Sequence, residues 1–173
     1  SAYSYFYQNA YVSVESSASA YFDGYVTIED YSGLHVYGGA EIAYSGNVEV
    51  RYSGELYVEY GGNLVVRNYL NVFDGGYLYV HGDMTVEGSL YAYYYGQVYV
   101  ESGTLTITGY ASIDYYSSLT VYQGTLVVER WASLEVYYES TIYFDYLSRT
   151  ELLGYFRLYY DAYLYLGWEA LVR

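Results

Sequence analysis

The chain of 173 residues contains no cysteine, no proline and no lysine, and its six positively charged side chains are all arginine. Without cysteine, disulfides and thiolate metal sites are excluded. The formal net charge is −14, so nucleic acid and acidic membrane surfaces would repel the chain. No apolar run approaches the roughly 18 residues of a membrane-spanning helix. We therefore expect no nucleic-acid partner and no membrane insertion.

Tyrosine and glycine are abundant, with 33 and 18 copies respectively. So narrow a choice of residues is typical of a low-complexity repeat protein or of a computational design. The glycines form three interleaved series that repeat about every 21–23 residues. Since glycine tolerates positive φ and close backbone approach, three series indicate three corners per repeat. The series are Gly39, Gly61, Gly82, Gly103 and Gly124; Gly24, Gly46, Gly88 and Gly109, with Asn68 and Arg130 in the missing places; and Gly33, Gly54, Gly76 and Gly96, continued by Ser118 and Ser140.

Between the corners lie short segments in which two apolar residues are separated by one other residue. This alternation is the period of a β-strand, and the enrichment in valine, isoleucine, tyrosine and threonine supports it. No segment has a helical period over more than one turn. The first side carries Val12 and Val14, Leu34 and Val36, Leu56 and Val58, Leu78 and Val80, Val98 and Val100, Leu119 and Val121, Ile142 and Phe144, and Leu164 and Leu166. The second runs from Ala20 and Ile42 to Leu126 and Val128, and the third from Val26 and Ile28 to Phe156 and Leu158.

The pattern predicts an all-β fold, a three-sided parallel β-solenoid (β-helix) with about seven to eight coils of roughly 22 residues. The parity of the inward residues changes at Ser102–Gly103 and changes back at Gln123–Gly124, which indicates one-residue insertions at a single corner. An antiparallel meander of short strands is the competing architecture, but it does not explain why three glycine corners recur in every repeat. A right-handed coil is favoured because parallel crossovers are usually right-handed.

We expect residues 1–173 to form one solenoid domain. Within it, residues 1–10 are a candidate N-terminal donor strand or cap. Residues 145–173 form less regular C-terminal coils.

Segments such as GTLTITG, GTLVVER and GNVEVRYSG resemble the short-strand repeats of right-handed parallel β-helices. The relevant families are autotransporter passengers, filamentous-haemagglutinin-like adhesins and the wider pectin-lyase-like superfamily. The resemblance covers the chain from Tyr11 to Phe144 and lies in the pattern rather than in a signature motif. It implies an extracellular or cell-surface location. The tyrosine-rich exterior departs from the asparagine ladders and threonine-rich surfaces that are common in those families.

Outward-facing tyrosines on the first side are the main candidate for a binding surface. Stacked coils would align Tyr57, Tyr79 and Tyr99 in one aromatic row, and Tyr143 and Tyr165 continue the same side. Such a row stabilises a sheet through cross-strand pairs. It could also bind a polysaccharide or a protein partner, because tyrosine is enriched at interfaces. A second tyrosine set, including Tyr44, Tyr52 and Tyr60, is expected to fold over the corners and shield the core.

The sequence carries no recognisable catalytic or metal site. His35 and His81 are the only histidines, and no cluster has the spacing of zinc ligands. Asp74 and Asp83 lack partners at matching positions in adjacent coils, and the scattered glutamates are interpreted as solvated charge. No phosphate-binding loop, dinucleotide fingerprint or nucleophile motif is present. We therefore expect no enzymatic activity and no cofactor.

Both ends of the solenoid are predicted to be open. No amphipathic capping helix is apparent, and both terminal segments alternate as strands do, so each end can pair with another chain. The residues expected to take part are Tyr3, Tyr5, Tyr7, Tyr163, Tyr165 and Trp168. The function predicted is that of a structural protein that associates with itself, end to end, in an extracellular fibre or surface layer. The alternatives are a carbohydrate-binding adhesin segment that uses the tyrosine row, and a designed scaffold without natural function.

Overall fold

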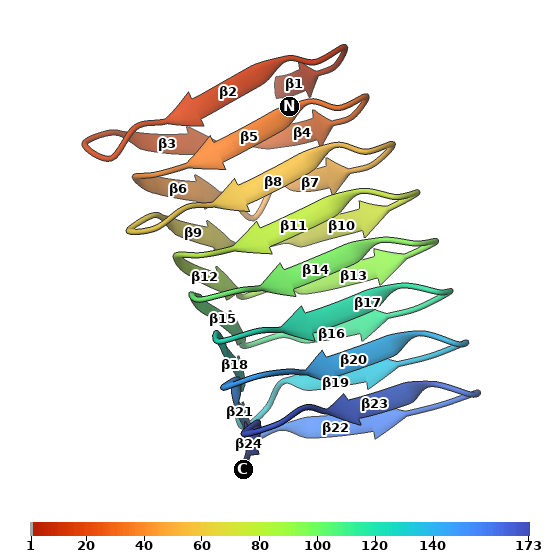
Figure 1. Ribbon diagram of the computed structural model, residues 1–173. Coiled ribbons are helices and arrows are strands. Elements are labelled where there is room, and N and C mark those ends of the chain that lie inside the picture. Colours follow the sequence, from red (N-terminus) through yellow and green to blue (C-terminus); the bar gives the residue numbers. More distant parts are fainter. Residues whose placement is uncertain (1) are drawn as a thin grey trace.

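A computed structural model describes residues 2–173, which form 24 β-strands and no helix. The strands make three parallel sheets of eight strands each. Each turn of the chain contributes one strand to every sheet, so the molecule is a three-sided solenoid of eight coils, with its two termini at opposite ends (Figure 1). The predicted architecture is confirmed. No helix in the described residues could cross a bilayer.

The three sheets are named A, B and C in the order in which the chain enters them, and coils are numbered 1–8 from the N-terminus. Sheet A contains β1 (Ala2–Phe6), β4 (Gly24–Ile28), β7 (Asn47–Val50), β10 (Tyr69–Phe73), β13 (Ser89–Tyr93), β16 (Tyr110–Ile113), β19 (Ser133–Val136) and β22 (Tyr155–Leu158). Sheet B contains β2 (Tyr11–Val14), β5 (Gly33–Val36), β8 (Glu55–Val58), β11 (Tyr77–Val80), β14 (Gln97–Val100), β17 (Ser118–Val121), β20 (Thr141–Phe144) and β23 (Tyr163–Leu166). Sheet C contains β3 (Ser19–Phe22), β6 (Gly39–Ile42), β9 (Asn63–Val66), β12 (Asp83–Val86), β15 (Thr104–Ile107), β18 (Thr125–Val128), β21 (Arg149–Leu152) and β24 (Leu171–Val172).

The coils stack in register, and like residues form ladders. Val48, Leu70 and Leu90 are direct Cα partners on β7, β10 and β13. In Figure 1 the nearer strands of sheet B run leftward and the fainter strands of sheet A run rightward as the chain descends, so the coil is right-handed. This is the hand that parallel crossovers favour.

The interior is a continuous apolar column. The inward pairs expected from the alternation are buried from coil 2 to coil 7, and most of them, such as Leu78 and Leu134, are 0% exposed. Every second side chain of a β-strand lies on the same face of its sheet. The two inward residues of each strand can therefore be buried together. The terminal coils depart from the expectation, because their inward residues lie partly or largely in solvent.

The corner between sheets A and B has the same length in every coil. Four residues separate the last inward residue of sheet A from the next strand of sheet B, and the middle two have positive φ in all eight coils. Among these sixteen residues Gly75 is the only glycine; pairs such as Tyr94 (φ 47°) and Tyr95 (φ 67°) take the left-handed conformation instead. Left-handed non-glycine residues cost roughly 1–2 kcal/mol each. Hydrogen bonds between stacked corners, such as Tyr95 N–H to the Tyr115 carbonyl at 3.2 Å, offset part of this cost.

Most corner glycines are needed for close backbone packing rather than for positive φ. Only Gly61 and Gly75 have positive φ, whereas a Cβ on most of the others would overlap backbone of the preceding coil. The register also corrects several members of the predicted series by one or two residues. The equivalent positions are held by Gly38 instead of Gly39, Gly62 instead of Gly61, Ser32 instead of Gly33, Ser117 instead of Ser118, and Ala132 instead of Arg130.

The inward residues change between even and odd numbers at the corner between sheets B and C, because that corner varies in length. It spans two residues after β11, three after β14 and β17, and four after β20. The three-residue corners end at Gly103 and Gly124, where the sequence predicts one-residue insertions. Pairing continues undisturbed beyond them, with Leu105 opposite both Met84 and Leu126.

Replacing Gly82 by alanine is expected to destabilise the fold by about 2–3 kcal/mol. A Cβ there would overlap the carbonyl oxygens of Glu59 and Gly62, and the two-residue corner leaves the backbone little room to move. Gly39→Ala is the matched control, since its Cβ would lie 3.5 Å from Ser19 Oγ, an ordinary contact. That variant should stay within about 0.5 kcal/mol of the parent. Urea unfolding measures both, and equal losses would contradict the close-packing explanation.

Candidate functional site

The outer face of sheet B carries the predicted aromatic row. The ring centroids of Tyr57 and Tyr79 lie 4.6 Å apart, and those of Tyr79 and Tyr99 lie 5.2 Å apart, with nearly parallel planes. The row extends toward the N-terminus through His35, which stacks on Tyr57 at 4.3 Å, and Tyr11, which lies 4.5 Å from His35. These five rings are called the aromatic row below.

Thr120 interrupts the aromatic row, and Tyr143 and Tyr165 form a separate stack at 5.0 Å beyond it. Within the aromatic row the ring faces cover one another. What the surface offers to a ligand is therefore ring edges and phenol hydroxyls rather than open faces. Some hydroxyls already donate to neighbours, as Tyr57 does to Glu55 and Tyr99 to Gln97.

Close packing in the aromatic row raises the pKa of three phenols, those of Tyr57, Tyr79 and Tyr99. Burial, followed by the nearby charge of Glu55, raises the pKa of Tyr79 to about 12. Burial likewise raises the pKa of Tyr57 and Tyr99. The neutral phenol is thus the form that the folded protein favours.

Alkali is expected to destabilise the protein between about pH 10 and pH 12. An unfolded tyrosine ionises near pH 10, whereas folded Tyr79 keeps its proton to about pH 12. The folded state therefore binds more protons in this interval, and its stability falls as the pH rises. Thermal unfolding across the interval measures the effect, and Tyr79→Phe should reduce the slope. A slope unchanged by that substitution would contradict a role for Tyr79.

The C-terminal end of the solenoid exposes residues that are interior everywhere else. Leu164 and Leu166 of β23 are 37% and 63% exposed, whereas their ladder partners Ile142 and Phe144 are fully buried. The strand edges of β22, β23 and β24 also have no neighbour on this side among the described residues. We call this surface the C-terminal end face; its exposed apolar residues are Leu158, Leu164, Leu166 and Val172.

The N-terminal end face is formed by β1, β2 and β3, which are the outermost strands of their sheets. The candidate donor segment thus lies in the solenoid as β1, paired in parallel with β4 of its own chain. Of the inward residues here, Phe6, Val12, Ala20 and Phe22 pack against the core but are only partly buried, whereas Val14 is buried.

The tyrosines expected at the ends lie beside the end faces rather than on them. Tyr3 and Tyr5 point away from the core, and Tyr3 stacks on Tyr25 at 5.1 Å. Tyr163 and Tyr165 lie on the outer side of β23, while Trp168 stacks on Tyr146 at 5.9 Å. Tyr7 lies at the first corner. The aliphatic residues of the last coil, which give the end face its apolar character, can be found in the sequence as the last inward pairs.

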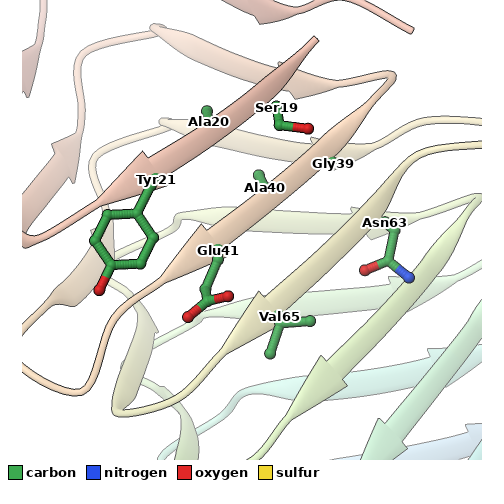
Figure 2. Close-up of a pocket in the computed structure, with 8 residues that line it drawn as sticks. All are labelled: Ser19, Ala20, Tyr21, Gly39, Ala40, Glu41, Asn63 and Val65. Atoms are coloured by element: carbon green, nitrogen blue, oxygen red, sulfur yellow. The ribbon is translucent and has the colours of Figure 1, made fainter. Parts of the chain in front are cut away.

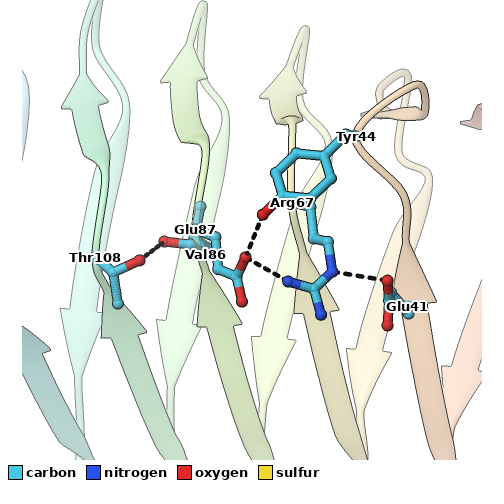
Figure 3. A network of polar contacts seen from close by, with 6 residues as sticks. All are labelled: Glu41, Tyr44, Arg67, Val86, Glu87 and Thr108. Carbon is cyan, nitrogen blue, oxygen red and sulfur yellow. Dashed lines mark hydrogen bonds and ion pairs between the residues drawn. The ribbon is translucent and has the colours of Figure 1, made fainter.

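Arginine and glutamate form a polar ladder on the outer side of sheet C (Figure 3). Arg67 Nε lies 2.7 Å from Glu41, and its Nη1 lies 2.6 Å from Glu87. The Tyr44 hydroxyl donates to Glu87 at 3.3 Å, and the Arg67 guanidinium lies over the Tyr44 ring. Glu41, Glu87, Glu29 and Glu135 are therefore paired with arginine, which corrects the interpretation of the glutamates as solvated charge alone.

The corner tyrosines do not shield the core as expected. Tyr44 and Tyr60 are 70% and 71% exposed, and Tyr52 is exposed as well. The small buried side chains Ala43 and Ala132 close the corners between sheets C and A in coils 2 and 6. A ring there would not fit beneath the next coil, because stacked backbones leave only about 4.8 Å.

Hollows on the surface are shallow. One of about 400 Å³ lies over β3, β6 and β9, where Gly39 and Ala40 leave space between Tyr21 and Asn63 (Figure 2). His35 Nδ1 lies 2.7 Å from Glu59, outside this hollow. Within residues 2–173 no group of three histidine, aspartate or glutamate side chains is placed to hold a metal ion.

Comparisons with models of known families, with curated proteins and with solved structures found no match to this chain.

Proposed function

We propose that the chain is a non-enzymatic structural protein whose copies associate end to end through their open end coils. One observation carries this proposal. The last coil exposes leucines that belong to the interior ladders, beside three strand edges that have no neighbouring strand within residues 2–173. Exposed apolar surface next to open edges is the usual template for pairing with another chain.

Each end coil supplies one strand to each of the three sheets, so a second copy can continue all three at once. Head-to-tail stacking would place β1 of one copy beside β22 of the other, β2 beside β23 and β3 beside β24. Leu158 would then meet Phe6, Leu164 would meet Val12, and Val172 would meet Ala20. Because the two surfaces differ, the contact is heterologous and does not close, which produces a filament.

Charge opposes such a filament only weakly at the contact itself. The last coils contain Arg149, Arg157 and Arg173 against Glu151, Asp161 and Glu169, a balance of 3 − 3 = 0 from residue 149 onward. The first coil carries Glu15 and Asp23, a balance of −2 up to residue 23. The net charge of −14 is thus concentrated in the middle coils. Salt should favour association by screening that charge.

Sedimentation velocity over a concentration series tests the proposal. The average mass should rise with concentration and rise further in added salt. A strictly monomeric protein at high micromolar concentration, at low and high salt alike, would overturn it.

The resemblance to adhesin and passenger repeats favours an extracellular fibre or surface layer as the setting. It also raises a second candidate, a polysaccharide-binding segment that uses the aromatic row. The favouring observation is the regular spacing of phenol hydroxyls on Tyr57, Tyr79 and Tyr99, one per coil. A glycan array tests this candidate; no binder, or full binding after all three are changed to serine, would remove it. A scaffold without natural function predicts neither glycan binding nor assembly.

A further inference from the structure

A hollow of about 270 Å³ lies on the outer side of sheet A, between β13 of coil 5 and β16 of coil 6. Four of its lining side chains are tyrosines, and one is a carboxylate. The side chains that face it come from Tyr91, Tyr93, Tyr94, Ser112, Asp114 and Tyr115.

The hollow exists because coil 6 carries small side chains where its neighbours carry large ones. Ser112 lies between Tyr91 of coil 5 and Glu135 of coil 7 in the register of sheet A. Two residues further along, Asp114 lies between Tyr93 and Tyr137. Ala92 and Ile113 are register partners, and Tyr93 and Asp114 are the residues that come directly after them.

Asp114 also interrupts a stack of aromatic rings on the outer side of sheet A. Phe73 and Tyr93 stack at 4.9 Å on one side of the gap, and Tyr137 and Tyr159 stack at 4.7 Å on the other. Tyr94 meets Tyr93 edge-on at 5.5 Å and stacks on Tyr115 at 5.0 Å. On the side of Tyr93 that faces coil 6, the place of the next ring in the ladder is taken by Asp114.

Asp114 is a half-buried carboxylate without a cationic partner in residues 2–173, where the ion pairs of Arg51, Arg67, Arg149 and Arg157 all go to glutamates. Its Oδ1 accepts a hydrogen bond of 2.8 Å from the backbone N–H of Tyr115. Burial raises the pKa of the Asp114 carboxyl. A cation in the hollow would compensate the partly desolvated charge.

We infer that this hollow binds a small organic ammonium ion, with Asp114 as counter-charge and the tyrosine rings as its walls. Aromatic walls attract alkylated ammonium groups through the negative faces of their rings, within about 6 Å of the ring centroid. The volume lies below the roughly 300–1,000 Å³ of drug-sized sites, which suits a small ligand. Apart from one carboxylate, the side chains of the lining offer only neutral serine and tyrosine hydroxyls, whereas a calcium ion takes about 6–8 oxygens, mainly from carboxylates, carbonyls and water.

The larger hollow in Figure 2 lacks this combination. Tyr21 is the only ring in its lining, and its carboxylate, Glu41, already pairs with Arg67 at 2.7 Å. Its charge therefore needs no ligand.

Isothermal titration with choline, compared with its uncharged analogue 3,3-dimethylbutan-1-ol at constant ionic strength, tests the inference. Choline should bind at least about tenfold more tightly than the alcohol, since only the cation gains from Asp114 and from the ring faces. Asp114→Asn should weaken choline binding about tenfold, because the amide keeps the hydrogen bond to Tyr115 but loses the charge. Asp161→Asn is the matched control: it removes the same charge at an exposed corner of coil 8 and should change the affinity less than about twofold.

Three results would overturn the inference. They are the absence of choline binding, equal binding of choline and the alcohol, and an equal loss in the two aspartate variants. The first comparison uses the unmodified chain, so it stands even if a variant fails to fold. A monomeric protein that binds choline would refute end-to-end assembly and leave this site intact.

Discussion

Leu78→Ala is expected to lower the free energy of unfolding by about 3–5 kcal/mol. The side chain is 0% exposed and lies between Leu56 and Val98 in the inward ladder of sheet B. Coils above and below hold the backbone in register, so the walls of the new cavity cannot collapse to fill it. Urea unfolding of the purified variant at low concentration measures the loss.

Leu164→Ala is the matched control, because Leu164 occupies the same ladder in the last coil and is 37% exposed. It removes the same atoms from a site that has a neighbouring coil on one side only. In the monomer it should cost about 1–2 kcal/mol, at the lower end of large-to-small substitutions. Equal losses at both positions would contradict the stacking of coils as the source of stability.

Leu166→Glu is expected to weaken association between copies by about 100-fold or more. Leu166 is the most exposed of the interior leucines on the C-terminal end face. In a head-to-tail contact it would lie against the first coil, where a carboxylate would be buried without a partner. An unpaired charge in an interface costs about 2–5 kcal/mol, and each 1.4 kcal/mol is about tenfold in affinity.

Tyr143→Ser serves as the control for association, because Tyr143 is 40% exposed on the outer side of sheet B, one coil inside the C-terminal end face and not part of it. Sedimentation of that variant should match the parent. Assembly that survives Leu166→Glu, or that fails equally with Tyr143→Ser, would place the contact elsewhere on the molecule.

The fold could be predicted from sequence because one period governs the whole chain. Pairs such as Val48 and Val50 recur along the chain, and successive pairs are separated by glycines. Each recurrence independently supports the same coil. The register of the residues at the corners is harder to predict from the sequence. The sequence places Gly39 and Gly61 in one series, whereas Gly38 and Gly62 hold the equivalent positions. Loops of two to four residues at that corner make spacing alone ambiguous.

The left-handed pairs at the corner between sheets A and B were not predictable from residue type. Tyrosine disfavours positive φ, yet Tyr115 and Tyr116 adopt it, because the constant four-residue interval and the neighbouring coils impose that path. The interval itself was a usable signal, since its last residue is always glycine, serine or alanine.

The candidate sites, too, were predictable from the sequence only in part. Alignment of Tyr57, Tyr79 and Tyr99 follows from coil stacking and was predicted correctly. The covering of their faces depends on rotamers, which sequence does not supply. The hollow at Asp114 was missed because it is defined by a side chain that interrupts a ladder. Such an interruption can be recognised only once the register with Tyr93 and Tyr137 is known.

Electron microscopy of the concentrated protein tests the central claim, that open end coils join copies into filaments, most directly. Eight coils spaced about 4.8 Å apart predict unbranched filaments one solenoid wide with an axial subunit repeat of about 38 Å. Isolated particles of single-chain size at the highest concentration reached, or filaments whose strands run along the fibre axis, would contradict the account.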